Sequence, residues 1–151
     1  MITSYMPESF IAAQPELERI IPRHWQEIAR DQDIIKLDPD WESYHAAERA
    51  GQLFMMVCRV DGDMVGYHIC FVRPHLHYRK SLSAITDIFY ILPEYRSGRI
   101  GIDLFKESEK ALKARGVQKV FLGCKLAHDL THIFKRLGYS PIEYVFAKLI
   151  G

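Results

Sequence analysis

One segment limits the possible folds more strongly than any other: residues 88–105, IFYILPEYRSGRIGIDLF. A β-branched and aromatic run ends at Pro93, a turn with two glycines and two arginines follows, and an amphipathic stretch comes next. The pattern predicts a strand, a turn and a helix over residues 102–115. Free N–H groups at that helix N-terminus suit a phosphate, whereas the alternative is an ordinary glycine-capped turn. The P-loop and GxGxxG patterns are both absent.

Hydrophobic periodicity and turn residues predict the remaining elements. Pro22 falls inside the first helix, so a kink or two short helices is expected there. The order gives an antiparallel hairpin followed by a β-α-β unit, hence a mixed, mostly antiparallel sheet in an α/β or α+β domain. The expected helices are 16–30, 41–50 and 129–137, the expected strands are 53–60, 64–72, 83–92, 117–123 and 144–150, and residues 73–80 are expected as a polar loop.

Composition narrows the class of protein. The 151 residues fit one domain over 1–151, and a net charge of +1 without a basic tail argues against nucleic acid as a partner. No apolar stretch reaches 18 residues, and the N-terminus lacks a signal-peptide pattern, so we expect no membrane span and no secretion. Three cysteines without a CxxC spacing indicate reduced thiols and a cytoplasmic location.

The turn over residues 96–101 resembles the acetyl-CoA-binding motif of the GNAT N-acetyltransferases, Arg/Gln-x-x-Gly-x-Gly/Ala. The element order is also similar to that family, and IFKRLGY (133–139) resembles its later F-Y-x-x-x-G-F signature. PHLHYRKSL and DIFYILPEYR look similar to small members encoded by bacteriophages. The resemblance implies a three-layer GNAT-type domain in which helices flank a mixed sheet.

The resemblance also implies where acetyl-CoA binds. The backbone of Phe89, Tyr90 and Ile91 would pair with the pantetheine arm, and an N–H near Ile91 would polarise the thioester carbonyl. Phe134 stands near the CoA sulfur, where many members carry a tyrosine that acts as the general acid. Arg99 stands where the family usually has glycine, and either binds phosphate or points to solvent. The pyrophosphate would lie against Arg96, Ser97, Gly98, Arg99, Ile100, Gly101 and Ile102.

Proton transfer needs further residues. Asp87 lies inside an apolar strand, nine residues before Arg96, a spacing at which many GNAT proteins carry a glutamate. We expect it to accept the amine proton, the alternatives being a structural hydrogen bond or binding of the substrate cation. The proton donor could be Tyr139, Tyr144, Tyr90 or water. The loop residues His75, His77 and Tyr78 either line the acceptor pocket or are solvated.

The sequence therefore predicts acetyl transfer from acetyl-CoA to a primary amine, on a small molecule or a protein, by direct attack in a ternary complex. A catalytically weak or inactive domain that binds CoA or a partner protein is the alternative. Minor alternatives are a metal site at Cys124, His128 and His132, and Cys124 as an acyl carrier; no metal is expected. A homodimer through the last strand or the first helices is a further possibility.

Overall fold

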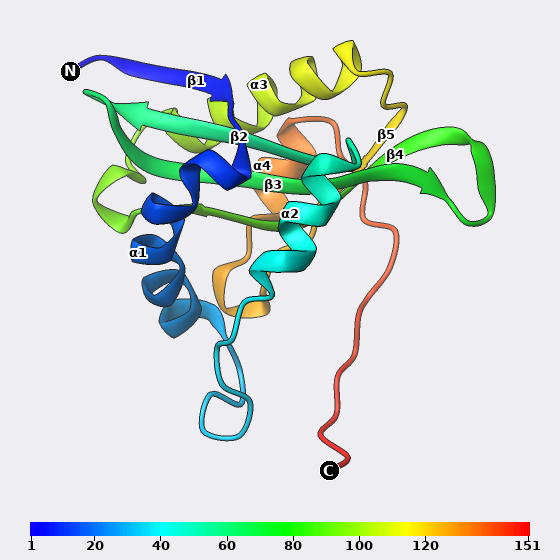
Figure 1. Ribbon diagram of the computed structural model, residues 1–151. Helices are drawn as coiled ribbons and strands as arrows, with labels where there is room; N and C mark the ends of the chain where they lie inside the picture. Colours follow the sequence, from blue (N-terminus) through cyan, green and yellow to red (C-terminus); the bar gives the residue numbers. More distant parts are fainter.

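A five-stranded sheet in the order β1-β2-β3-β4-β5 forms the centre of the computed structural model, which describes residues 1–151 (Figure 1). β1 to β4 are antiparallel neighbours, and β5 joins β4 in parallel. Two 3₁₀ turns, Pro93–Tyr95 and Leu126–His128, complete the elements. The strands are β1 (Thr3–Pro7), β2 (Leu53–Val60), β3 (Asp63–His75), β4 (Tyr78–Ile91) and β5 (Lys119–Phe121), and the helices are α1 (Phe10–Ile28), α2 (Trp41–Arg49), α3 (Ile100–Ala114) and α4 (Thr131–Arg136).

Helices cover both faces of the sheet, which gives three layers (Figure 1). On one face, α1 buries Phe10 and Leu17 against Tyr67 and Ile69 of β3, and α2 packs at the margin of this cluster. On the other face, Leu104 and Leu112 of α3 pack on β2 and β3. The fold class predicted from the sequence, a mixed and mostly antiparallel sheet between helices, is confirmed.

The β2–β3 hairpin follows directly from its turn residues. Asp61 and Gly62 both have positive φ angles, 49° and 88°, which a two-residue hairpin turn with the right twist requires. Arg59 donates to the Gly62 carbonyl at 2.9 Å and also pairs with Glu8 and Glu16, so the same end of the hairpin is tied to the start of the chain.

Helix α1 begins earlier than expected and is continuous. Ser9 caps it by accepting from the Ala12 N–H, and the Glu48 carboxylate of α2 accepts from the Phe10 N–H at 2.5 Å. These caps move the start from residue 16 to Phe10. The alternative of two short helices at Pro22 is wrong, because α1 runs through this proline to Ile28 as one helix.

Several other expectations need correction. Residues 73–80 are not a loop, because β3 continues to His75 and β4 begins at Tyr78. The two strands are paired through their backbone N–H and carbonyl groups. The expected strand over 144–150 pairs with nothing, and β1 was not expected because it is short and half exposed. β5, α3 and α4 keep their predicted places with different ends. No helix combines the length and apolar character needed to cross a membrane.

Candidate active site

The edge of β4 that faces β5 is open over most of its length. The two strands pair only where Ser83–Ile85 of β4 meets β5. From Thr86 to Ile91 β4 has no strand on that side, and we call this unpaired edge the β4 gap. The Leu92 N–H donates to the Val65 carbonyl of β3 at 2.8 Å. Because N–H directions alternate along a strand, the Ile91 N–H points into the β4 gap.

A bulge redirects Asp87 at the start of the β4 gap. Ile69 of β3 pairs with Ile88, and the next residue, Cys70, pairs with Thr86, so Asp87 is an extra residue without a cross-strand partner. Asp87 and Ile88 consequently face the same side of the sheet, the side covered by α1 and α2. Bulges of this kind recur beside active sites because they re-aim a side chain.

Asp87 forms a pair with a tyrosine that the sequence analysis missed. The Tyr44 hydroxyl of α2 donates to Asp87 Oδ2. The residue Asp87 is exposed, yet packing around its carboxyl group raises its pKa by desolvation, and the hydrogen bond from Tyr44 opposes this rise. Burial, followed by the hydrogen bond to Asp87, raises the pKa of Tyr44, which therefore keeps its proton. No local pattern in residues 41–50 indicated this contact, since it joins elements 43 residues apart.

Arg96, the first residue of the predicted phosphate turn, points toward helix α1. Its guanidinium binds the Glu27 carboxylate through both terminal nitrogens, at 2.5 and 2.9 Å, and its Nε donates to the Ile91 carbonyl at 2.8 Å. The Tyr90 hydroxyl donates to the same carboxylate at 2.6 Å. The Arg96 hydrogen bonds are the main reason why the pKa of Glu27 falls to about 2. Arg96 thus fixes the turn to α1, and its guanidinium is already occupied.

The turn over residues 96–101 leaves backbone N–H groups at the start of α3 without an intramolecular partner. Gly98 has a φ of +83°, and no side chain caps the start of α3, so the first N–H groups of the helix are free for a ligand. A Cβ on Gly101 would lie 3.4 Å from Ile91 Cδ1, which shows how closely α3 approaches β4. Arg99 is 70% exposed and forms an ion pair with Asp103 at 3.2 Å, so it lies on the solvent side.

An aromatic cluster fills the α3 side of the β4 gap. Phe89, Phe105 and Phe134 meet edge to face, with centroid distances of 5.1 to 6.1 Å. Tyr139 packs beside Phe134 at 6.1 Å, and burial together with the Glu109 carboxylate raises its pKa. The structure therefore brings α4 next to β4, and it puts Tyr139 beside Phe134.

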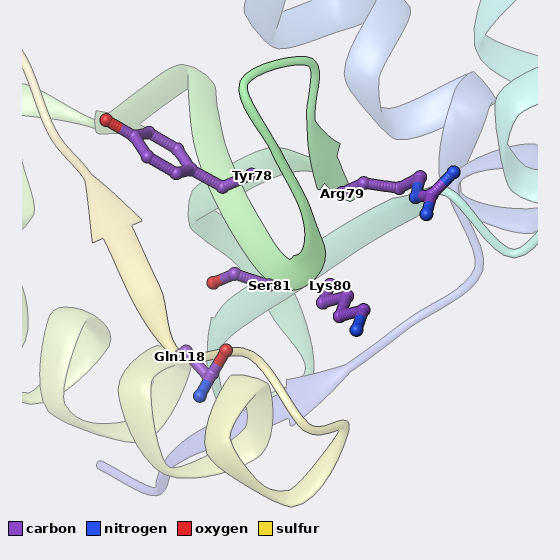
Figure 2. Close-up of a pocket in the computed structure, with 5 residues that line it drawn as sticks. All are labelled: Tyr78, Arg79, Lys80, Ser81 and Gln118. Atoms are coloured by element: carbon purple, nitrogen blue, oxygen red, sulfur yellow. The ribbon is translucent and has the colours of Figure 1, made fainter.

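Other predicted site residues lie elsewhere. His75, His77 and Tyr78 cluster at the tip of the β3–β4 hairpin, and the nine residue steps along β4 from Tyr78 to Asp87 span roughly 30 Å. An open depression of about 490 Å³ beside this hairpin is lined by residues 78–81 and Gln118. In Figure 2 the Tyr78 ring and the Arg79 side chain point to opposite sides. Tyr144 is 87% exposed on the C-terminal segment. The hairpin residues are thus separated from Asp87 within one chain.

The minor alternatives gain no support from the geometry. His128 ends a 3₁₀ turn while His132 lies in α4, so they do not share one helix face. Cys124 Sγ accepts from the Leu130 N–H at 3.4 Å, and its thiol donates to Asp129. No group of three or more His, Cys, Asp or Glu side chains is arranged to hold a metal ion.

Comparison with known proteins adds an independent observation. Residues 15–139 match the model of the family described as Acetyltransferase (GNAT) family. A comparison with curated protein sequences found no match. The closer resemblance to bacteriophage-encoded members finds no support in these comparisons and stays a prediction.

Solved structures share the whole fold at low identity. An aminoglycoside acetyltransferase from an uncultured soil metagenomic sample has a TM-score of 0.75 at 11% identity, with 100% of both chains covered. A ribosomal-protein-alanine N-acetyltransferase from Brucella melitensis biovar Abortus 2308 has 0.74 at 14%, covering 99% of this chain and 100% of the other. A predicted acetyltransferase with acetyl-CoA from Clostridium acetobutylicum has 0.72 at 12%, covering 97% and 96%. At these identities the likeness establishes the fold.

Proposed function

The chain belongs to the acetyltransferase (GNAT) family, and we propose that it transfers the acetyl group of acetyl-CoA to a primary amine by direct attack in a ternary complex. The observation that carries this proposal is the β4 gap, which has an uncapped helix N-terminus at one end and the Asp87–Tyr44 pair at the other. The three free cysteines suit a reducing compartment, so we place the reaction in the cytoplasm.

The residues at the β4 gap fit acetyl-CoA. The free N–H groups from Ser97 to Ile102 would hold its pyrophosphate, because an uncapped helix N-terminus favours an anion. The open backbone of residues 89–91 would pair with the pantetheine amides as an added strand does. The cofactor supplies an activated thioester. The Ile91 N–H, which points into the β4 gap, would hold the carbonyl oxygen of that thioester.

The amine approaches from the face covered by α1 and α2, where Asp87 is exposed. An alkyl amine is mostly protonated at neutral pH, since its pKa is about 10.4. The Asp87 carboxylate would bind this ammonium group and accept its proton, directly or through water. The raised pKa of Asp87 makes it a better base near neutral pH than an ordinary aspartate. Tyr44 would hold the carboxylate in position.

Fewer groups remain as candidates for protonating the leaving thiolate than the sequence analysis gave. The Tyr90 hydroxyl is bonded to Glu27, and Tyr144 lies on the exposed C-terminal segment. Tyr139, whose ring packs beside Phe134, and water are the proposed donors. Because Phe134 has no proton to give, a domain that binds CoA without turnover is the second candidate function.

The acceptor is proposed as an amine on a small molecule or on a protein. Two of the structural neighbours are named as acetyltransferases of aminoglycosides and of a ribosomal-protein alanine, and an amine is the acceptor chemistry that these names share. The exposed carboxylate of Asp87 suits a cationic amine. Nucleic acid and membranes are not proposed as partners, given the net charge of +1.

The first test is the melting temperature with acetyl-CoA, CoA or ATP. A ligand at about 100 times its dissociation constant adds roughly 2.7 kcal/mol, which for this length raises the melting temperature by roughly 5–10 °C. We expect a rise with both CoA compounds and none with ATP. No rise with either CoA compound would contradict the proposed cofactor. A rise without thiol release across a panel of amines would instead support the binding domain.

A pair of glycine variants locates the binding site. Gly98 in the phosphate turn and Gly62 in the β2–β3 turn have similar positive φ angles, +83° and +88°, and both face open space. Alanine should therefore strain the two positions equally. We expect Gly98→Ala to weaken acetyl-CoA binding, measured by calorimetry, while Gly62→Ala leaves it unchanged. Equal affinities of the two variants would place the cofactor elsewhere.

A further inference from the structure

Tyr90, near the end of the β4 gap, is held by three side chains on the α1 side of the sheet. The His24 imidazole of α1 stacks on the Tyr90 ring, with the centroids 4.3 Å apart and the planes inclined by 15°. The Arg96 guanidinium lies over the same ring, 5.1 Å from its centroid. The Tyr90 hydroxyl donates to the Glu27 carboxylate at 2.6 Å. We call His24, Tyr90 and Arg96 the Tyr90 stack.

His24 is itself fixed in place by its surroundings. It is only 4% exposed, and its Nδ1 lies 2.8 Å from the hydroxyl oxygen of Tyr67 on β3. Tyr67 is the residue that pairs with Tyr90 across the two strands. Burial lowers the pKa of His24 to about 4, so the imidazole is uncharged at neutral pH and does not repel the Arg96 guanidinium. Helix α1 therefore places a fixed, neutral ring on Tyr90.

Arg96 also changes what Ile91, the next residue of β4, offers to a ligand. The Arg96 Nε donates to the Ile91 carbonyl at 2.8 Å. The N–H and C=O groups of one strand residue point to the same edge, so both Ile91 groups face the β4 gap and only the N–H remains open. A chain that adds as a strand needs donors and acceptors in turn. Ile91 offers a donor alone, which suits a carbonyl oxygen.

We propose that His24 and Tyr90 are positioning residues for the Ile91 N–H, and that Arg96 makes Ile91 a donor-only site for the thioester carbonyl. The inference rests on the proposed function and deepens it. In the β4 gap β4 has a partner strand on one edge only, and the side-chain contacts of the Tyr90 stack take the place of the second strand. The N–H belongs to the peptide group between Tyr90 and Ile91. The stack holds the residue before this peptide group, and Arg96 Nε holds the residue after it. A donor fixed in advance stabilises charge on the carbonyl oxygen without rearranging during the reaction.

The preference for acetyl-CoA over CoA isolates this contact, because the two ligands differ only in the acetyl thioester. Calorimetry measures both dissociation constants. We expect His24→Ala, which removes the ring from Tyr90, to lower the preference by roughly 2- to 10-fold, as loss of one hydrogen bond does. Its kcat should fall further, because the contact is strongest in the transition state. His24→Phe keeps a ring on Tyr90 and should retain the preference.

Two comparisons distinguish positioning from a merely structural role. His24→Ala and His24→Phe both leave the Tyr67 hydroxyl without its partner, so a structural role predicts the same ligand preference in both variants. Equal preferences would overturn the proposal. His45→Ala is the matched control, because His45 also has one side-chain hydrogen bond, to Gln14 of α1, and its one ring contact is with Phe10. We expect His45→Ala to lose stability with an unchanged preference.

Arg96→Lys tests the proposal even where His24→Ala does not fold. Lysine keeps the charge but lacks the Nε–H that bonds the Ile91 carbonyl, and the Arg96 side chain is 38% exposed. We expect a weaker preference for acetyl-CoA in this variant. In amide NMR spectra of the wild type, the Ile91 resonance should move with acetyl-CoA and not with CoA.

An unchanged preference in Arg96→Lys, or an Ile91 amide that responds equally to both ligands, would overturn this inference alone, since CoA would still bind. A wild-type protein that binds neither CoA compound would remove the proposed function and this inference together.

Discussion

At the scale of single residues, the bulge in β4 determines what Asp87 can do. A regular strand would alternate Asp87 and Ile88 across the sheet, but the extra residue leaves both on the side of α1 and α2. We therefore expect Asp87→Asn to lower kcat by roughly 10²-fold or more while leaving acetyl-CoA affinity unchanged. Steady-state kinetics and calorimetry measure the two effects. Asp33→Asn, at an exposed position, is the control. Equal turnover of Asp87→Asn and wild type would remove Asp87 from the mechanism.

Tyr44 should act on the same carboxylate through its pKa. Desolvation raises the pKa of Asp87, and the hydrogen bond from Tyr44 lowers it. Since the base works only when deprotonated, kcat/KM rises with pH through this pKa. Tyr44→Phe removes the lowering contribution, so the acidic limb of the profile should move to higher pH. A pH–rate profile of both proteins measures this shift. An unchanged limb with a uniformly lower rate would indicate that Tyr44 serves packing alone.

At the scale of elements, helix α1 and the phosphate turn are joined by the Glu27–Arg96 ion pair. The pKa of Glu27, about 2 in the folded protein, lies below its ordinary value of 4.5, so the pair stabilises above pH 4.5 and is lost as pH falls toward 2. Both side chains are partly exposed, which limits the effect to about 1 kcal/mol. We expect Glu27→Gln to be less stable at pH 7, with the difference from wild type shrinking below pH 4.5 in urea titrations.

A matched variant tests whether the expected stability loss is specific to the Glu27–Arg96 ion pair or common to surface ion pairs. Glu94→Gln removes the Arg23–Glu94 pair, which also joins α1 to the turn but is half exposed on both sides. It should leave the unfolding free energy unchanged. Glu27→Gln should also raise the KM for acetyl-CoA with little change in kcat, because the turn loses its anchor. A pH-independent stability difference would show that charge is not the cause.

Local patterns were sufficient for some elements and not for others. The β2–β3 hairpin and the place of α3 after its glycine-containing turn depend on residues next to each other, such as the Asp61-Gly62 turn, and were predicted, although α3 begins two residues before residue 102. The start of α1 depends on Glu48, which lies 38 residues away, and was not. The expected strand over 144–150 has the residues of a strand, but in the structure it pairs with no edge of the sheet.

At the scale of the whole molecule, the candidate site also has parts that local sequence patterns indicate and parts that they do not. The turn over residues 96–101 and Asp87 could be proposed from the sequence, because a motif and an acidic residue inside an apolar strand are visible there. Tyr44, Glu27 and the length of the β3–β4 hairpin were missed, since each depends on how distant elements pack. Pairing of β3 with β4 out to His75 and Tyr78 keeps these residues away from Asp87. Neither charge nor composition predicts how far this pairing extends.

Gly66 of β3 affects both the stability of the sheet and the geometry of the site, because a side chain there would have no room beside β4. A Cβ on Gly66 would lie 2.9 Å from the Tyr90 carbonyl oxygen and 3.0 Å from Ile91 Cγ1. Because backbone cannot yield as a side-chain end does, Gly66→Ala must displace β4 and with it the Ile91 N–H. Overpacking of this kind costs roughly 1–3 kcal/mol. We expect a lower unfolding free energy in urea together with weaker acetyl-CoA binding.

Gly123→Ala provides the comparison for Gly66→Ala, because Gly123 has an unstrained backbone and no atom near its would-be Cβ. It should change neither stability nor affinity. A domain of this size normally unfolds in one cooperative step, so strain at Gly66 should appear as a shift of the whole transition. If Gly66→Ala unfolds at a lower urea concentration but binds acetyl-CoA as well as wild type does, the Ile91 N–H is not a ligand of the thioester. Joint loss of both properties would connect the register of β3 and β4 to the chemistry at the β4 gap.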